Sequence, residues 1–157
     1  LYDSALAALA NQATNYLMAG QIAKPMGTLH PNIAPYGECF PCKNGELLVL
    51  AVGNDKQFKA LCAVLKMPEL ATDARFLHNH LRVKNRKALA ERLTEAIQTQ
   101  EREALLTVLI EKDVPAGAVR NMQEVLEAKE AQSRLLQEEK EGSTLSTLSG
   151  NAFEISD

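Results

Sequence analysis

The sequence predicts an α+β fold, in which a small sheet that contains a β-hairpin is packed against several helices. Asn44-Gly45 separates two segments that read as strands, the second of them apolar, and these two residue types tolerate the positive φ angles of a hairpin turn. Apolar residues at helical spacing then recur in the segments that follow residue 54. Together the two patterns predict one small α+β domain, with a further helix before it and a tail after it.

The composition excludes several classes of protein. The chain has 157 residues, 46% of them hydrophobic and 24% charged, as in a globular domain with a real core. Basic and acidic residues are mixed and the net charge is −3, so we expect no nucleic-acid groove. No apolar run has the length of a membrane span, so we expect no membrane partner. Three cysteines make no disulfide framework, and we expect a cytoplasmic protein.

The first element is a predicted helix over residues 1–19, with Gly20 as its C-terminal cap. Apolar residues lie on nearly every side of this helix, so it requires cover on several sides. The chain opens directly inside this helical pattern and no charged leader precedes it. We therefore expect no signal peptide, and we expect the chain to be a piece of something longer.

A loop rich in proline follows, because the helical periodicity stops after residue 20. Pro25, Gly27, Pro31 and Pro35 fall within eleven residues, and such clusters mark ordered or semi-ordered loops. Long loops inside compact domains are often functional. The segment from Gly27 to Tyr36 is therefore the first place to look for a site.

The elements of the small domain come next. Strands are predicted over 36–41 and 46–52, and Asn54 with Gln57 forms the capping-box pattern of a helix start. One long helix is expected after Asn79, a further helix over 101–112, and a short extended segment over 114–119. Asn121 and Glu124 form a second capping box. Residues 142–149 read as a Ser/Thr-rich connection and 152–155 as a last strand.

Several residue clusters could in principle carry chemistry, and each has a simpler interpretation. Cys39 and Cys42 have the spacing of a metal or redox pair, but no second pair completes a zinc site, so we interpret them as packing residues. His78 and His80 stand at a helix start, where a surface role is the simpler interpretation. The basic residues after them are predicted to face water as one side of a helix: Arg82, Lys84, Arg86 and Lys87. No metal site and no catalytic residue is predicted in the chain.

A turn at Gly53, Asn54 and Asp55 leads from a strand into a helix, as a phosphate-binding loop does. No further glycine pattern follows it, so an ordinary turn is the simpler interpretation. The amide groups at the start of the helix could still hold an anion.

Short sequence motifs along nearly the whole chain resemble those of the class III CoA-transferases, the family of formyl-CoA transferase. The clearest are HPNIAPY at residues 30–36 and AVGNDKQF at 51–58. Other matching motifs occur, in the same order as in the family, at residues 1–6, 44–46, 68–76, 85–86 and 114–119. The related α-methylacyl-CoA racemases have a Glu after the AVG word, and this chain reads Gly53-Asn54-Asp55-Lys56, so transferase is favoured over racemase.

The resemblance implies a mechanism and a set of site residues. A nucleophilic aspartate in a large Rossmann-like domain would attack an acyl-CoA and pass through an aspartyl-CoA thioester to a carboxylate acceptor. That aspartate precedes residue 1 in the family, and Asp3 is not it. Coenzyme A would be a substrate and no cofactor would be bound permanently. The loop residues that would face the acyl group or the acceptor are Gly27, His30, Pro31, Asn32 and Tyr36, with Gly53, Asn54 and Asp55 as a turn near CoA.

The resemblance also implies a division of the chain. Residues 1–25 and 127–157 would belong to the large domain, and 26–126 would form the small one. The intact protein would be an interlocked homodimer. The chain lacks the glycine run that some members carry, which argues against a formyl or oxalate specificity. A free-standing binding or interaction module derived from the family stays open as the alternative.

Overall fold

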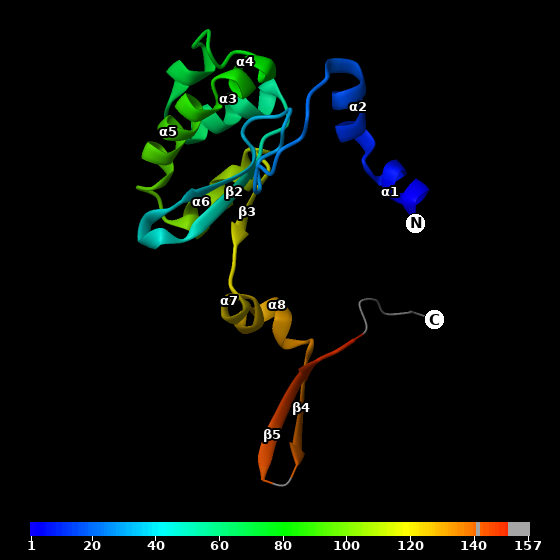
Figure 1. Cartoon of the computed structure of the whole chain (residues 1–157). Helices are drawn as coiled ribbons and strands as arrows, with labels where there is room; N and C mark the ends of the chain where they lie inside the picture. Colours follow the sequence, from blue (N-terminus) through cyan, green and yellow to red (C-terminus); the bar gives the residue numbers. More distant parts are fainter. Residues whose placement is uncertain (141, 151–157) are drawn as a thin grey trace, which may run out of the picture.

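A computed structural model describes residues 1–140 and 142–150 of the chain (Figure 1). Its centre is a three-stranded antiparallel sheet in the order β1-β2-β3. The strands are β1 (Tyr36–Pro41), β2 (Leu47–Ala51) and β3 (Ala116–Val119). The predicted α+β class is confirmed, and the predicted extended segment near residue 116 is the third strand.

The hairpin between β1 and β2 turns through a short 3-10 segment, η1 (Lys43–Gly45). Asn44 and Gly45 both take positive φ angles, 70° and 80°, as the sequence predicted for this pair. Phe40 pairs with Leu48, and the register shifts between Tyr36 and Glu38, which leaves a bulge at Gly37.

Helices complete the domain: α3 (Asp55–Val64), η2 (Pro68–Ala71), α4 (Asn79–Lys84), α5 (Arg86–Ile97) and α6 (Arg102–Glu111). The Asn54 side chain caps α3 by accepting the Gln57 amide at 2.9 Å. The prediction of one long helix after Asn79 is wrong, because the chain breaks at Asn85. The buried core lies between the sheet and these helices and includes Phe40, Leu48, Leu50, Phe58, Leu61, Phe76, Leu89, Leu93 and Leu109.

The two ends of the described chain lie away from this core (Figure 1). The predicted single helix at the start is two helices, α1 (Tyr2–Ala8) and α2 (Ala10–Ala19), because Ala10 takes a φ of 43°. Neither helix has a buried residue. Gly20 ends α2 in the left-handed conformation, as predicted.

After β3 the chain forms α7 (Met122–Glu127), α8 (Lys129–Gln132) and a separate hairpin, β4 (Leu135–Lys140) with β5 (Ser143–Leu148). The interpretation of residues 142–149 as a connection is therefore wrong, and the predicted strand at 152–155 lies outside the described residues. The domain limits expected at 25/26 and 126/127 stay predictions. Within the described part of the chain, no helix combines the length and apolar character that a membrane span requires.

Candidate functional site

Residues 27–36, the proline loop, connect the N-terminal helices to β1. The second half of the loop is tied to the sheet. The His30 amide donates to the Tyr36 carbonyl at 3.0 Å, and the Val52 amide donates to the Pro35 carbonyl at 3.0 Å. Ala34 and Pro35 are buried. The loop is therefore built into the small domain at this end.

His30, Asn32 and Tyr36 are near one another at the tip and the end of the loop. The Asn32 amide donates to His30 Nδ1 at 3.1 Å, so the neutral imidazole carries its proton on Nε2. The His30 and Tyr36 rings meet edge to face, with centroids 5.4 Å apart. Three of the five predicted loop residues thus form one cluster.

The turn at Gly53 lies against this cluster. A Cβ placed on Gly53 would be 3.9 Å from Tyr36 Cε2, which is ordinary contact distance. The structure therefore brings Tyr36 of the loop next to Gly53 of the turn, which lies 17 positions later in the sequence. The Gly53 amide donates to Gln57 Oε1 at 2.8 Å, so this amide is already used by the protein and is not offered to an anion.

Asp55 at the start of α3 is paired on two sides. Its carboxylate lies 3.1 Å from His78 Nδ1 and 2.8 Å from Arg82 Nη2. Partial burial alone would raise the pKa of Asp55, but hydrogen bonds and charges from His78 and Arg82 outweigh it and hold the pKa below its usual value. Asp55 is therefore an ionised partner of His78 and Arg82, and its negative charge disfavours the binding of a second anion at this turn.

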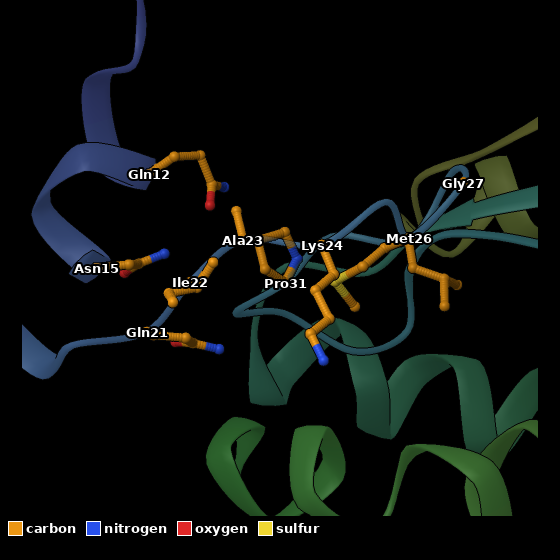
Figure 2. A pocket seen from close by; sticks show the side chains of 10 residues that line it. Gln12, Asn15, Gln21, Ile22, Ala23, Lys24, Met26, Gly27 and Pro31 are labelled. Atoms are coloured by element: carbon orange, nitrogen blue, oxygen red, sulfur yellow. The ribbon is translucent and has the colours of Figure 1, made fainter.

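Gly27 and Pro31 lie on another side of the loop. They line an open cavity of about 510 Å³ between the loop and the end of α2 (Figure 2). The other lining residues are Gln12, Asn15, Gln21, Ile22, Ala23, Lys24, Met26 and Leu29. Asn32 Nδ2 donates to Asn15 Oδ1 at 3.2 Å across this gap. The proline loop therefore contacts α2 through Asn32 and the Gly53 turn through Tyr36.

Two arginines that support the loop were assigned the wrong environment from the sequence. Arg82 and Arg86 were predicted to face water, but the Arg82 side chain has no exposed surface and that of Arg86 is 14% exposed. Lys84 and Lys87 are exposed as predicted. A signal was present, since residues 82 and 86 continue the helical stripe that holds Leu89 and Leu93.

Glu38 is the buried counter-charge of Arg86 and was also missed. It is 3% exposed, and its Oε1 lies 2.6 Å from Arg86 Nη1. Burial raises the pKa of Glu38, and the charge and hydrogen bond of Arg86 offset only part of this effect. The available signal was the spacing along β1. Residues two positions apart in a strand point to the same face, so Glu38 shares the inner face with Phe40.

The cysteine and histidine clusters show no metal site. Cys39 is exposed and Cys42 is buried, so the two side chains face different environments. His78 and His80 are exposed and stacked, with ring centroids 6.0 Å apart. Among residues 1–140 and 142–150, no three His, Cys, Asp or Glu side chains are grouped as metal ligands.

Comparison with known proteins places this arrangement in a family. The family described as CoA-transferase family III matches residues 1–155. Human succinyl-CoA:glutarate CoA-transferase is 38% identical over 125 residues, which are 80% of this chain and 28% of that protein. The succinate–glutarate CoA-transferase of Agrobacterium fabrum is 38% identical over 135 residues, which are 85% of this chain and 33% of that protein.

A solved structure agrees with the sequence relatives. The crystal structure of a CaiB/BaiF family protein from Brucella suis superposes with a TM-score of 0.75 at 38% identity, and the match covers 95% of this chain and 38% of that one. The chain thus spans about a third or less of the length of the curated relatives that it matches. The match over residues 1–155 shows that the chain belongs to CoA-transferase family III.

Proposed function

We propose that this chain is the loop-bearing part of an enzyme that moves coenzyme A between an acyl-CoA and a carboxylic acid. The observation that carries the proposal is the proline loop, whose His30, Asn32 and Tyr36 gather beside the Gly53 turn. Membership of the family supports it. The two curated relatives are named for succinyl-CoA or succinate and for glutarate, so the proposed substrates are short dicarboxylates rather than formyl-CoA.

The proposed chemistry is covalent carboxylate catalysis. An enzyme carboxylate attacks the thioester carbonyl carbon of the donor, the C–S bond breaks, and CoA thiolate leaves behind a mixed anhydride. The thiolate then attacks the enzyme's own carbonyl, which releases the donor acid as a carboxylate and forms an aspartyl-CoA thioester. The acceptor carboxylate runs the same two steps in reverse. The role proposed for the loop is to exclude water from the anhydride.

The nucleophile is proposed to lie outside this chain. A nucleophilic carboxylate must be ionised and accessible to the thioester. Near the loop, the described carboxylates are Glu38, which is buried against Arg86, and Asp55, which is held by His78 and Arg82. Neither meets the requirement, so we assign the reactive aspartate to another segment of the working protein.

Separating the chain from the complete protein tests this proposal. The 157-residue chain and the complete protein that contains it would each be incubated with succinyl-CoA and glutarate, and glutaryl-CoA would be measured by chromatography. We expect transfer only by the complete protein, with an aspartate labelled by borohydride during turnover. Sustained turnover by the chain alone would contradict the assignment of the nucleophile, and an inactive complete protein would contradict the enzyme proposal.

A free-standing binding module is the second candidate, and one observation favours it. Among the described residues, the buried core cluster lies within residues 40–114, so the small domain has a core of its own. Calorimetric titration of the chain with CoA discriminates the two candidates. A module predicts saturable binding by the chain without transfer by any longer product of the same coding region.

The working form is proposed to be a homodimer in a reducing, cytoplasmic compartment. The exposed apolar side chains of α1 and α2, among them Leu6 and Leu17, support an extensive contact with other protein surface. The three cysteines, all free, support a reducing compartment.

A further inference from the structure

Two arginines from neighbouring helices donate hydrogen bonds to the backbone of the proline loop. Arg82 belongs to α4 and Arg86 begins α5, and both side chains are withdrawn from solvent. Withdrawing a guanidinium from water is costly unless its donors and its charge are satisfied. Their partners therefore define what these residues do.

Arg86 spans the tip of the loop. Its Nη2 donates to the carbonyl oxygens of His30 at 2.5 Å and Ile33 at 2.9 Å, and its Nη1 donates to Glu38 at 2.6 Å. One planar group thus fixes the two ends of the turn His30-Pro31-Asn32-Ile33 and binds it to β1. The rigid fork of donors makes this possible, and a lysine ammonium could not reproduce it.

The remaining polar groups of this turn are held by α4. Asn79 Nδ2 donates to the Asn32 carbonyl at 2.8 Å, and Asn79 Oδ1 accepts the Ala34 amide at 3.2 Å. Arg82 Nε donates to the Ala34 carbonyl at 2.8 Å. The backbone between His30 and Ala34 is therefore held chiefly by side chains that lie 45 or more positions away in the sequence.

Arg82 differs from Arg86 in its surroundings. Its guanidinium lies 4.5 Å from the centroid of the Phe58 ring, and its Nη1 donates to the Phe76 carbonyl at 3.0 Å. Its Nη2 has no hydrogen bond of good angle, and Asp55 at 2.8 Å balances the charge. Loss of Arg82 would disturb the core itself. Among the described residues, Arg86 is hydrogen-bonded to the loop and to Glu38 of β1, so its loss acts on the loop and on this strand rather than on the helical core.

We propose that Arg86 is a positioning residue that, with its buried partner Glu38, sets the conformation in which the proline loop presents His30 and Asn32 to the substrate. The role deepens the proposed CoA-transferase function and rests on it. Arg86 reaches the loop from behind, through backbone carbonyls, while the side chains of His30 and Asn32 stay free of it. Its effect on catalysis therefore passes through the loop.

Amide hydrogen exchange of the 157-residue chain tests the structural half without any assay of activity. The variant is R86K, which keeps the charge, and the control is R92K, at an arginine of α5 whose side chain is 46% exposed. We expect the amides of His30, Asn32 and Ala34 to exchange at least about 10-fold faster in R86K. Those of the α5 core should not change. Unchanged exchange in the loop would overturn the proposal.

Kinetics of the complete protein test the catalytic half. For R86K we expect kcat to fall about 10- to 100-fold and KM for the acyl-CoA to change less than about threefold. R92K should match the parent in both. Faster loop exchange with an unaltered kcat would overturn the positioning role. A parent protein without transferase activity would overturn the proposed function, while the exchange result would still decide whether Arg86 orders the loop.

Discussion

Gly37 and Thr28 lie so close together that a Cβ placed on Gly37 would come within 2.0 Å of the Thr28 carbonyl oxygen. Gly37 also has a φ of 75°, a conformation that residues with a Cβ rarely adopt. The glycine at the start of β1 therefore gives the first part of the proline loop room to pack against the strand. Its bulge in the β1-β2 register is the backbone side of the same contact.

The substitution G37A is therefore expected to damage the fold and to displace the loop. The positive φ alone costs about 1 kcal/mol, and the clash with backbone at Thr28 adds to it because a carbonyl cannot rotate away like a side chain. The comparison is G45A, since Gly45 has a φ of 80° but no atom within 4 Å of a Cβ. Urea unfolding should show a larger loss for G37A than for G45A. Equal losses would mean that the contact with Thr28 is relaxed in solution.

The ion pairs of Asp55 predict that the stability of the folded chain depends on pH in the acidic range. Its pKa is lower in the folded chain than in the unfolded chain, so the ionised form stabilises the fold. This contribution is fully present above the unfolded pKa of about 3.9 and is lost as the pH falls through the lower folded pKa. The parent chain should therefore lose stability more steeply than D55N as the pH falls below about 4.

At pH 7 the substitution D55N leaves the buried Arg82 without its counter-charge. We expect D55N to be less stable than the parent by about 1–3 kcal/mol there. E91Q, at an exposed carboxylate of α5, serves as the control and should follow the parent. Parallel pH profiles for the parent and D55N would contradict a role for Asp55 in this pair.

The three thiols should differ sharply in reactivity. Burial raises the pKa of Cys62 to about 11, and burial, followed by the nearby Glu46, raises the pKa of Cys42. Cys39 is exposed. With Ellman's reagent at pH 8 we expect one thiol to react quickly and two only after unfolding, and C39S should remove the fast phase. Two fast thiols in the native chain would show that Cys42 opens to solvent.

The local features of this chain could be predicted from sequence because their partners are a few residues apart. The Asn54 cap and the capping box of Asn121 with Glu124 form as expected, with bonds that span three residues. The hairpin at Asn44 is of the same kind, since the φ preference of the residues themselves decides it. Such contacts need no knowledge of the rest of the fold.

The support of the proline loop could not be predicted in the same way. Arg82 and Arg86 bond to backbone that lies 48 to 56 positions earlier, and carbonyl acceptors leave no mark in the side-chain pattern. A run of Arg and Lys usually forms a solvent-exposed face. In this run Lys84 and Lys87 are exposed, whereas Arg82 and Arg86 are largely buried. The break of the first helix at Ala10 is likewise invisible, because alanine favours a continuous helix.

The exposed apolar side chains of α1 and α2 lead to the last prediction. Leu6 is 48% exposed, Leu17 77% and Ile22 73%, and they border an open groove of about 580 Å³. Its other lining residues are Leu9, Gln12, Ala13, Tyr16, Gln21 and Ala23. Contiguous exposed apolar surface of this kind is uncommon on monomers, and covering it is favourable by about 25 cal/mol per Å² before the costs of association.

We therefore expect the isolated chain to self-associate through α1 and α2 at micromolar concentration. The double variant L6Q/L17Q should shift sedimentation toward monomer with little loss of stability, because neither side chain belongs to the buried core. I110Q is the matched control, since Ile110 is 60% exposed on α6 and lies outside the groove. If the parent sediments as a monomer at tens of micromolar, the groove is too weak to bind a second copy. If I110Q dissociates the chain as well as L6Q/L17Q does, association runs through exposed apolar surface in general and not through these two helices.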